Sequence, residues 1–472
     1  MDTLRIRQTL RLYNLITLLG CGGFAFAWSK SGNALSSMAF GFSMFLIGDY
    51  FRVLGSRPIV FKETILLFCA LQLLFAPFCA YWLVDTGATY QMEIPPNDYF
   101  GFAFPSILSL WAGFLFWRGS ASPVGPFRRS IRISSTLGNS LIVISWVCTG
   151  VASVAPPSIA FILWIFTAMG LVTAISDVSK PWQCIPVWRV IVAFIPFLVA
   201  SLSFGMFHEL LVWGAWITPV LVWKKGIPKV FTILTMIGLF MVAMLLDTAK
   251  ADYRSRILAG KPIGIGEKIR ILHESISLED DHENLSFWGG RIRRLNQGYL
   301  VTKVMRWIPQ MRPFDHGQSI VESIEASILP RFFAPDKREV GGRENMLRFT
   351  GIDVPGGTSM NIGILGEFWG NFGHWGILAY AMLGTMLHFL SRGVIRLLLY
   401  FRGGVWFYPL IMCSWINAEG DFYAPFNNTV KVLLLVLPFL WVCNLISSHD
   451  VAADHLRRGR RMVRSSNKGG IS

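Results

Sequence analysis

Residues 230–248 read VFTILTMIGLFMVAMLLDT, an apolar run whose one charged residue, Asp247, stands near its end. An α-helix needs about 20 such residues to cross the hydrocarbon core of a bilayer, so this run predicts a transmembrane helix. Similar runs recur along the chain and give twelve predicted spans, at roughly 12–29, 34–51, 64–84, 100–117, 139–156, 158–176, 187–205, 207–223, 230–248, 364–390, 404–420 and 429–447. The sequence therefore predicts an all-α, polytopic integral membrane protein.

The overall composition supports this class. Hydrophobic residues make up 53% of the 472 residues and charged residues 15%, whereas a typical soluble chain is about 25% charged. The 18 Trp and 37 Phe residues supply the aromatic side chains expected at bilayer interfaces. A soluble multidomain enzyme, a disordered chain and a disulfide-stapled secreted module are excluded.

The placement of the positive charges predicts the orientation. One set of short segments holds 23 Lys and Arg residues, while the short loops on the opposite side hold only Lys30. Short cytoplasmic loops are enriched in Lys and Arg, so both termini are predicted to be cytoplasmic. Arg5, Arg7 and Arg11 precede a full-length apolar span without a small-residue cleavage site, which favours an uncleaved membrane anchor over a signal peptide.

One long hydrophilic segment, residues 249–360, interrupts the spans on the non-cytoplasmic side. Its 112 residues include 17 Lys and Arg and 14 Asp and Glu, which indicates a mixed-charge surface. Its periodicity predicts helices near 264–278 and 291–307, followed by irregular chain. The predicted organisation is nine membrane helices in 1–248, a large non-cytoplasmic loop in 249–360, three membrane helices in 361–448 and a basic cytoplasmic tail in 449–472.

Charged residues within or beside membrane spans are costly and therefore are candidates for function. Those predicted to lie towards the outer face are Glu209, Asp247, Glu367, Glu419 and Asp421. Glu63 is predicted on the inner side, at the interface near Lys62.

The densest polar signal runs from the second half of the loop into the next span. It comprises RWIPQMRPFDHG (306–317), ILPRFFAPDKREVGGRENMLRF (328–349) and GGTSMNIGILGEFWGNFGHWG (356–376). Arg can clamp phosphate oxygens, and a nearby carboxylate can take a proton from a hydroxyl. A lipid diphosphate substrate would need this pairing. The alternative is a folded polar cap held by surface ion pairs.

Pro330, Arg331 and Lys337, followed by G-E-F-W-G-N-F-G at 366–373, resemble the oligosaccharide repeat-unit polymerases of the Wzy type. This resemblance implies a GT-C-like membrane glycosyltransferase of the bacterial inner membrane, which uses undecaprenyl-diphosphate-linked oligosaccharides on the periplasmic face. Such an enzyme transfers the growing glycan to the non-reducing end of an incoming unit. It implies that no cofactor and no metal are needed, and it makes the loop at 249–360 a periplasmic catalytic cap. The expected partners are membrane lipids and a polysaccharide chain-length regulator. Nucleic acid is not an expected partner, because the cations follow the membrane topology.

The resemblance also implies roles for single residues. Glu367 is the expected catalytic residue, as acceptor base or substrate anchor, with a helix N-terminal carboxylate as the alternative. Arg331 is the second expected catalytic residue and contacts the diphosphate. Expected substrate-binding residues are Arg306, Arg312, Lys337, His316, Asn371 and Asp421. His316 is also an alternative base, and Asn371 an alternative helix cap.

Two other functions stay open. An O-antigen ligase uses the same donor with a different acceptor, and only the G-E-F-W-G-N-F-G segment favours the polymerase. A lipid-linked oligosaccharide flippase or other transporter would place charges across the bilayer midplane and show repeat symmetry. Here the charges gather at the outer rim and no repeat is evident.

Overall fold

The computed structural model describes residues 2–116, 135–152, 155, 157–176, 187–204, 208–225, 229–248, 253, 256, 265–282, 287–328, 342–354, 360–401 and 403–466. Every regular element in these ranges is a helix. Five of them are long and apolar enough to cross a membrane: Ala34–Val53, Phe61–Trp82, Pro96–Phe116, Gly363–Leu398 and Tyr423–Leu445. The prediction of an all-helical membrane protein is confirmed.

The helices before the polar loop are α1 (Asp2–Ser31), α2 (Ala34–Val53), α3 (Phe61–Ala70), the π-helix η1 (Leu71–Phe75), α4 (Ala76–Trp82), α5 (Pro96–Phe116), α7 (Ser135–Ala152), α8 (Pro157–Ser176), α9 (Val187–Phe204), α10 (His208–Lys225) and α11 (Lys229–Thr248). Each coincides with a predicted apolar run. A short 3-10 turn, η2 (Ala88–Tyr90), lies between α4 and α5.

The polar loop contains more helix than its composition predicts. Its helices are α13 (Ile265–His282), α14 (Phe287–Leu295), α15 (Gly298–Trp307), α16 (Gln318–Ile328) and α17 (Arg343–Thr350). The predicted helix near 264–278 is confirmed, and the one near 291–307 is present as α14 and α15. The expectation of irregular chain afterwards is wrong for α16 and α17. Gly342 and Gly351, both in the left-handed conformation, lie at the two ends of α17. The glycines that suggested a loop therefore delimit a short helix.

The last part of the chain holds α18 (Gly363–Phe372), η3 (Gly373–Trp375), α19 (Gly376–Leu398), η4 (Gly404–Phe407), α20 (Tyr408–Met412), η5 (Cys413–Ile416) and α21 (Tyr423–Ser466). The predicted span 364–390 is interrupted at Gly373, which has a φ of 56°. The run 404–420 is three short helical pieces and not one continuous helix. Helix α21 passes through the predicted boundary at 448 and continues to Ser466.

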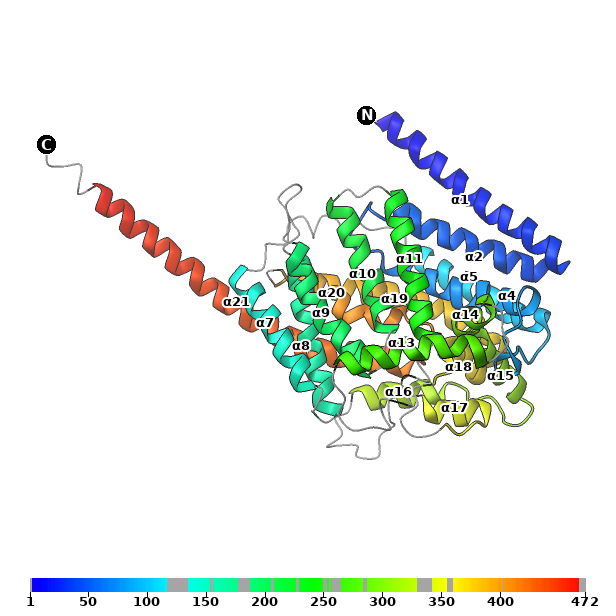
Figure 1. Cartoon of the computed structure of the whole chain (residues 1–472). Coiled ribbons are helices and arrows are strands. Elements are labelled where there is room, and N and C mark those ends of the chain that lie inside the picture. Colours follow the sequence, from blue (N-terminus) through cyan, green and yellow to red (C-terminus); the bar gives the residue numbers. More distant parts are fainter. Residues whose placement is uncertain are drawn as a thin grey trace.

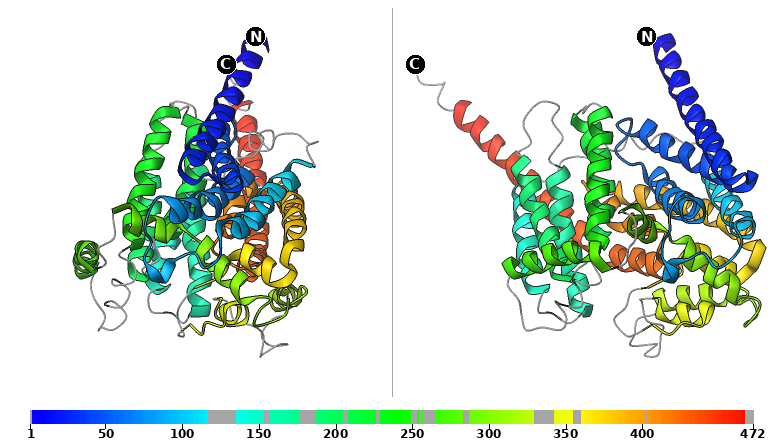
Figure 2. Two further views of the ribbon diagram at one scale, coloured as in Figure 1. Left: turned by 90° about the vertical axis from the view of Figure 1, so that its right-hand side faces the viewer. Right: turned by 45° about the vertical axis from the view of Figure 1, so that its right-hand side comes forward.

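The two ends of the chain extend from the same side of the molecule. Figures 1 and 2 show the start of α1 and the end of α21 on one side, and α16 and α17 on the opposite side. Helix α1 packs on α2, α5 on α19, and α16 on α21. The folded part of the polar loop thus covers the ends of the apolar helices.

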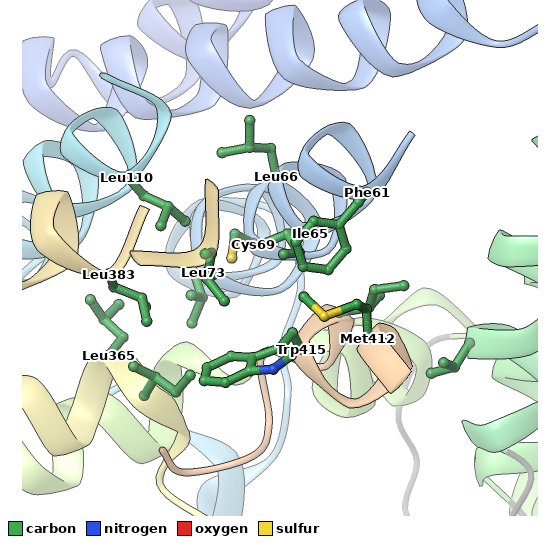
Figure 3. Packing of buried hydrophobic residues seen from close by; sticks show 14 of the residues in the cluster. Phe61, Ile65, Leu66, Cys69, Leu73, Leu110, Leu365, Leu383, Met412 and Trp415 are labelled. Carbon is green, nitrogen blue, oxygen red and sulfur yellow. The ribbon is translucent and has the colours of Figure 1, made fainter. Parts of the chain in front are cut away.

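The apolar core joins distant segments around α3. In Figure 3, Leu110, Leu365, Leu383 and Trp415 gather around α3 and η1, and all four side chains are almost fully buried. Helices α5 and α19 approach closely at two glycines: a Cβ on Gly384 would lie 2.5 Å from the Leu110 carbonyl oxygen, and one on Gly113 would collide with the Ala381 carbonyl. Small residues allow such close helix contacts in membranes. This contact fixes α19 and, with it, the preceding α18.

Candidate functional site

Glu367 lies in the middle of α18, and its side chain is completely buried. Its Oε1 accepts a hydrogen bond from the Ser319 hydroxyl of α16 at 2.8 Å, and its Oε2 accepts the backbone N–H of Phe422 at 2.7 Å. The Asn345 amide of α17 donates to Oε1 at 3.4 Å. Because a buried carboxylate needs donors, these bonds fix α18 against two loop helices and against the turn that precedes α21.

Asn371 lies one helical turn after Glu367 and is also completely buried. Its Nδ2 donates to the Ser319 hydroxyl at 2.9 Å and to the Glu367 carbonyl at 2.7 Å. Its Oδ1 accepts the Gly317 N–H at 2.8 Å, and its carbonyl accepts the His316 N–H at 3.0 Å. Asn371 therefore holds the turn that enters α16.

Asp421 completes this group from the other end of the chain. It is 2% exposed. Its Oδ2 accepts from the Asn345 amide at 2.9 Å, and its Oδ1 accepts the Ala424 N–H at 3.2 Å, in the first turn of α21. A carboxylate in this position satisfies a free N–H of a helix N-terminus.

We call these five residues, Glu367, Asn371, Asp421, Ser319 and Asn345, the buried polar cluster. Three of them were candidates from the sequence, and the structure brings all three together. Ser319 and Asn345 were not recognised, because isolated Ser and Asn residues in a polar segment carry no distinguishing pattern.

The other candidates lie elsewhere. The Arg306 side chain is 64% exposed and lies 3.4 Å from Glu93. Arg312 lies 3.6 Å from Asp315, and His316 is exposed with a φ of 49°. Arg331 and Lys337 lie outside the described residues.

Arg348 of α17 joins this helix to α16 through ion pairs. Its guanidinium donates to both Glu322 carboxylate oxygens, at 2.7 and 2.9 Å, and lies 3.5 Å from Asp315. The hydrogen bond to Glu322 raises the pKa of Arg348 above its ordinary value. Asp315 in turn accepts the Ser319 N–H at 3.1 Å. The ion pairs of Arg348 thus help to position Ser319, the residue whose hydroxyl donates to Glu367.

A second polar region surrounds the π-helix η1. Gln72 lies within it, and the Gln72 amide donates to Glu419 Oε1 at 3.0 Å. The backbone carbonyl of Gln72 accepts the Gln297 N–H at 3.2 Å, and that of Leu73 accepts the Tyr99 hydroxyl at 2.8 Å. Such π-helical turns are frequent at functional sites. Here the turn frees carbonyl groups for partners outside the helix.

Two arginines of α14 lie beside this region, and α14 packs on α4. The guanidinium carbons of Arg293 and Arg294 lie 5.0 and 5.9 Å from the centroid of the Tyr90 ring. The buried Arg294 Nε has no hydrogen-bond partner among the described residues. Burial raises the pKa of Tyr299; Tyr90 and Glu419 add to the rise, and Arg294 opposes it. Arg294 and Glu419 therefore both act on Tyr299. Sequence reasoning missed these arginines, although three cations in FWGGRIRRL were a visible signal.

The turn at residues 417–422 joins the two regions. Glu419 accepts from Gln72 on one side. On the other side Asp421 belongs to the buried polar cluster, and the Phe422 N–H donates to Glu367 of that cluster. Glu419 is half-buried, in contrast to the fully enclosed Glu367. We call this segment the acidic turn. It places a half-buried carboxylate beside η1, where the backbone N–H of Gln297, just after α14, also hydrogen-bonds.

In the described part of the chain, no group of three or more His, Cys, Asp or Glu residues is arranged to hold a metal ion. No protein-family model, no curated protein and no solved structure matches this chain.

Proposed function

We propose that this protein is a metal-independent membrane glycosyltransferase that polymerises a bacterial surface polysaccharide. It transfers a growing glycan from undecaprenyl diphosphate to the non-reducing end of an incoming lipid-linked repeat unit, on the periplasmic face of the inner membrane. In this proposal the chain has about twelve spans in a GT-C-like arrangement, and both termini are cytoplasmic. The common side of the two chain ends, opposite α16 and α17, supports that topology.

The meeting of Glu419 and the end of α14 at the π-helix η1 is the observation that carries the proposal: the Gln72 amide donates to Glu419, and the backbone N–H of Gln297, two residues after α14, donates to the Gln72 carbonyl. A lipid diphosphate needs cations, and an arginine guanidinium such as that of Arg294 can donate to phosphate oxygens. Arg293 adds positive charge on the same helix. Arg331 and Lys337 belong to the proposal as further diphosphate contacts.

Glu419 is the proposed general base. The acceptor hydroxyl oxygen attacks the anomeric carbon of the donor glycan, and its proton passes to the Glu419 carboxylate. The glycosidic bond forms as the bond from the anomeric carbon to the diphosphate oxygen breaks, and undecaprenyl diphosphate leaves. The Gln72 amide orients the carboxylate through its hydrogen bond at 3.0 Å.

Glu367 has a different role in this proposal. Both of its oxygens already accept hydrogen bonds, and none of its surface is exposed. A base must reach the proton that it removes. Glu367, Asn371 and Asp421 therefore act as positioning residues that hold the acidic turn and α16.

A deletion strain tests the function. We expect surface material capped with a single repeat unit, which is the product of a strain without a polymerase. Long polymer stranded on undecaprenyl diphosphate at the periplasmic face would instead identify a ligase. Single units trapped on the cytoplasmic leaflet would identify a flippase, and either result would overturn the proposal.

A further inference from the structure

A second site lies near the opposite ends of the membrane helices, far along the chain from the acidic turn. A cavity of about 440 Å³ is enclosed by α1, α2, the turn at residues 56–57, α3 and α5. In the proposed topology this is the cytoplasmic face, because Arg52, Arg57 and Lys62 belong to a predicted cytoplasmic loop. The cavity does not depend on the glycosyltransferase activity.

The polar side of the cavity holds three cations and two carboxylates. Arg52 Nε donates to Asp49 Oδ1 at 2.9 Å. Arg57 pairs with Glu63, and Lys62 Nζ lies 3.5 Å from the same carboxylate. Glu63, predicted to lie at the inner membrane interface near Lys62, is 3% exposed.

Two buried polar atoms of residues that line this cavity lack a hydrogen-bond partner in the described structure. They are Glu63 Oε2, an acceptor, and Arg57 Nε, a donor. Buried polar groups without partners are rare and costly in folded proteins. A ligand that fills both needs must offer an acceptor to Arg57 and a donor to Glu63.

The remaining lining of the cavity is apolar and aromatic. It is formed by Phe45, Val53, Leu66, Trp111, Phe114 and Leu115, together with the ring of Tyr13. An ionic ligand without an apolar part would leave this surface uncovered. The combination of charged and apolar walls at a membrane edge matches a lipid.

We infer that this cavity binds the head group of an amine-bearing phospholipid, such as phosphatidylethanolamine. The phosphodiester accepts hydrogen bonds from Lys62 and the Arg57 guanidinium, and the ammonium donates to the Glu63 carboxylate. The glycerol and the start of an acyl chain lie against Trp111 and Phe114. Two carboxylates among three cations favour this zwitterion over a lipid that carries negative charge alone.

Native mass spectrometry of the full-length protein in detergent tests this inference. Phosphatidylethanolamine, phosphatidylglycerol and phosphatidic acid are added in equal amounts. We expect phosphatidylethanolamine to bind most tightly and Lys62→Gln to weaken its binding about tenfold, the effect of one charge-assisted hydrogen bond. Lys62→Arg should keep the binding. The matched control is Arg396→Gln, which removes an exposed cation from the same proposed membrane face and should bind like the wild type.

A second variant and a soluble ligand sharpen the test. Leu115→Trp fills the apolar side of the cavity without changing its charge, and it should weaken lipid binding to a similar extent. Glycerophosphoethanolamine, which has the head group but no acyl chains, should not displace the lipid; displacement would overturn the lipid as the ligand. Equal binding of phosphatidylglycerol would overturn the role given to the amine. Unchanged binding in both Lys62→Gln and Leu115→Trp would overturn the site.

Discussion

The carboxylate of Glu367 accepts the backbone N–H of Phe422 at 2.7 Å, across 55 residues of chain. This single bond ties α18 to the acidic turn, while the other oxygen of Glu367 holds Ser319 of the polar loop. Three segments that are far apart in the sequence therefore meet at one buried charge. The position of Glu419 depends on this junction, because Glu419 lies three residues before Phe422.

The first prediction concerns the stability of that junction. Glu367→Gln replaces one acceptor oxygen with an amide donor, which then faces the Phe422 N–H or the Ser319 hydroxyl. We expect a loss of about 2 kcal/mol in the free energy of unfolding, since a buried donor is left without a partner. Thermal unfolding of the purified protein in detergent measures this loss. Glu325→Gln on the exposed face of α16 is the control, and equal unfolding temperatures for the two variants would contradict the structural role.

The close contact of α5 and α19 makes a second prediction. Gly113→Ala drives a methyl group into the Ala381 carbonyl, and we expect a destabilisation of about 1–3 kcal/mol from overpacking. Gly393→Ala on α19 meets nothing within 4 Å and should leave stability unchanged or raise it by up to about 1 kcal/mol. Both variants make the same chemical change, the addition of one methyl group to a helical glycine. A similar unfolding temperature for both would therefore refute the close packing of α5 on α19.

The cations of α14 make a third prediction. Arg294→Gln removes a proposed diphosphate contact and should lower transfer activity at least about tenfold, with little change in thermal stability. The control, Arg270→Gln, removes an exposed cation of α13 that pairs with Glu267. Activity is measured as the release of undecaprenyl diphosphate from a lipid-linked oligosaccharide. Full activity of Arg294→Gln would remove this arginine from the site.

The proposed topology makes a fourth prediction. A cysteine placed at Arg270 in the polar loop should react in intact cells with a thiol reagent that cannot cross the inner membrane. A cysteine at Arg396 should react only after the membrane is opened. The unmodified chain, with its own cysteines, gives the background. The reverse pattern would invert the orientation and place the acidic turn in the cytoplasm.

The sequence predicted the apolar helices well, because a bilayer demands long apolar runs that are visible without tertiary information. It also predicted that Glu367 and Asp421 lie towards the same face of the membrane, since a charged side chain is costly at the centre of the bilayer. Ser319 and Asn345 could not be found, because their role depends on where two short polar helices pack. The π-helix at Leu71–Phe75 was equally hidden: LQLLF has the composition of an ordinary apolar helix, and only the geometry around Gln72 distinguishes it.

The burial of Glu367 shows another limit of the sequence. A charged residue in a membrane segment indicates function, but the pattern cannot distinguish a carboxylate that meets substrate from one that holds the backbone. Glu419 is half-buried and Glu367 is fully enclosed. This difference arises from the way the acidic turn folds, which the sequence pattern does not show. The basic residues of α14 stayed unassigned for a related reason, because only the packing of α14 on α4 brings them beside the region around η1.

The central claim is that Glu419 acts as the base of a glycan polymerase, and the most direct measurement uses purified protein with a lipid-diphosphate-linked repeat unit. The length of the product is followed by gel electrophoresis and the release of undecaprenyl diphosphate by chromatography. We predict that the wild-type protein forms polymer, and that Glu419→Gln, with an unchanged unfolding temperature, loses at least about 100-fold in rate, within the range typical of a general base. Polymer formation at the wild-type rate by Glu419→Gln, or no transfer by the wild-type protein, would contradict the account.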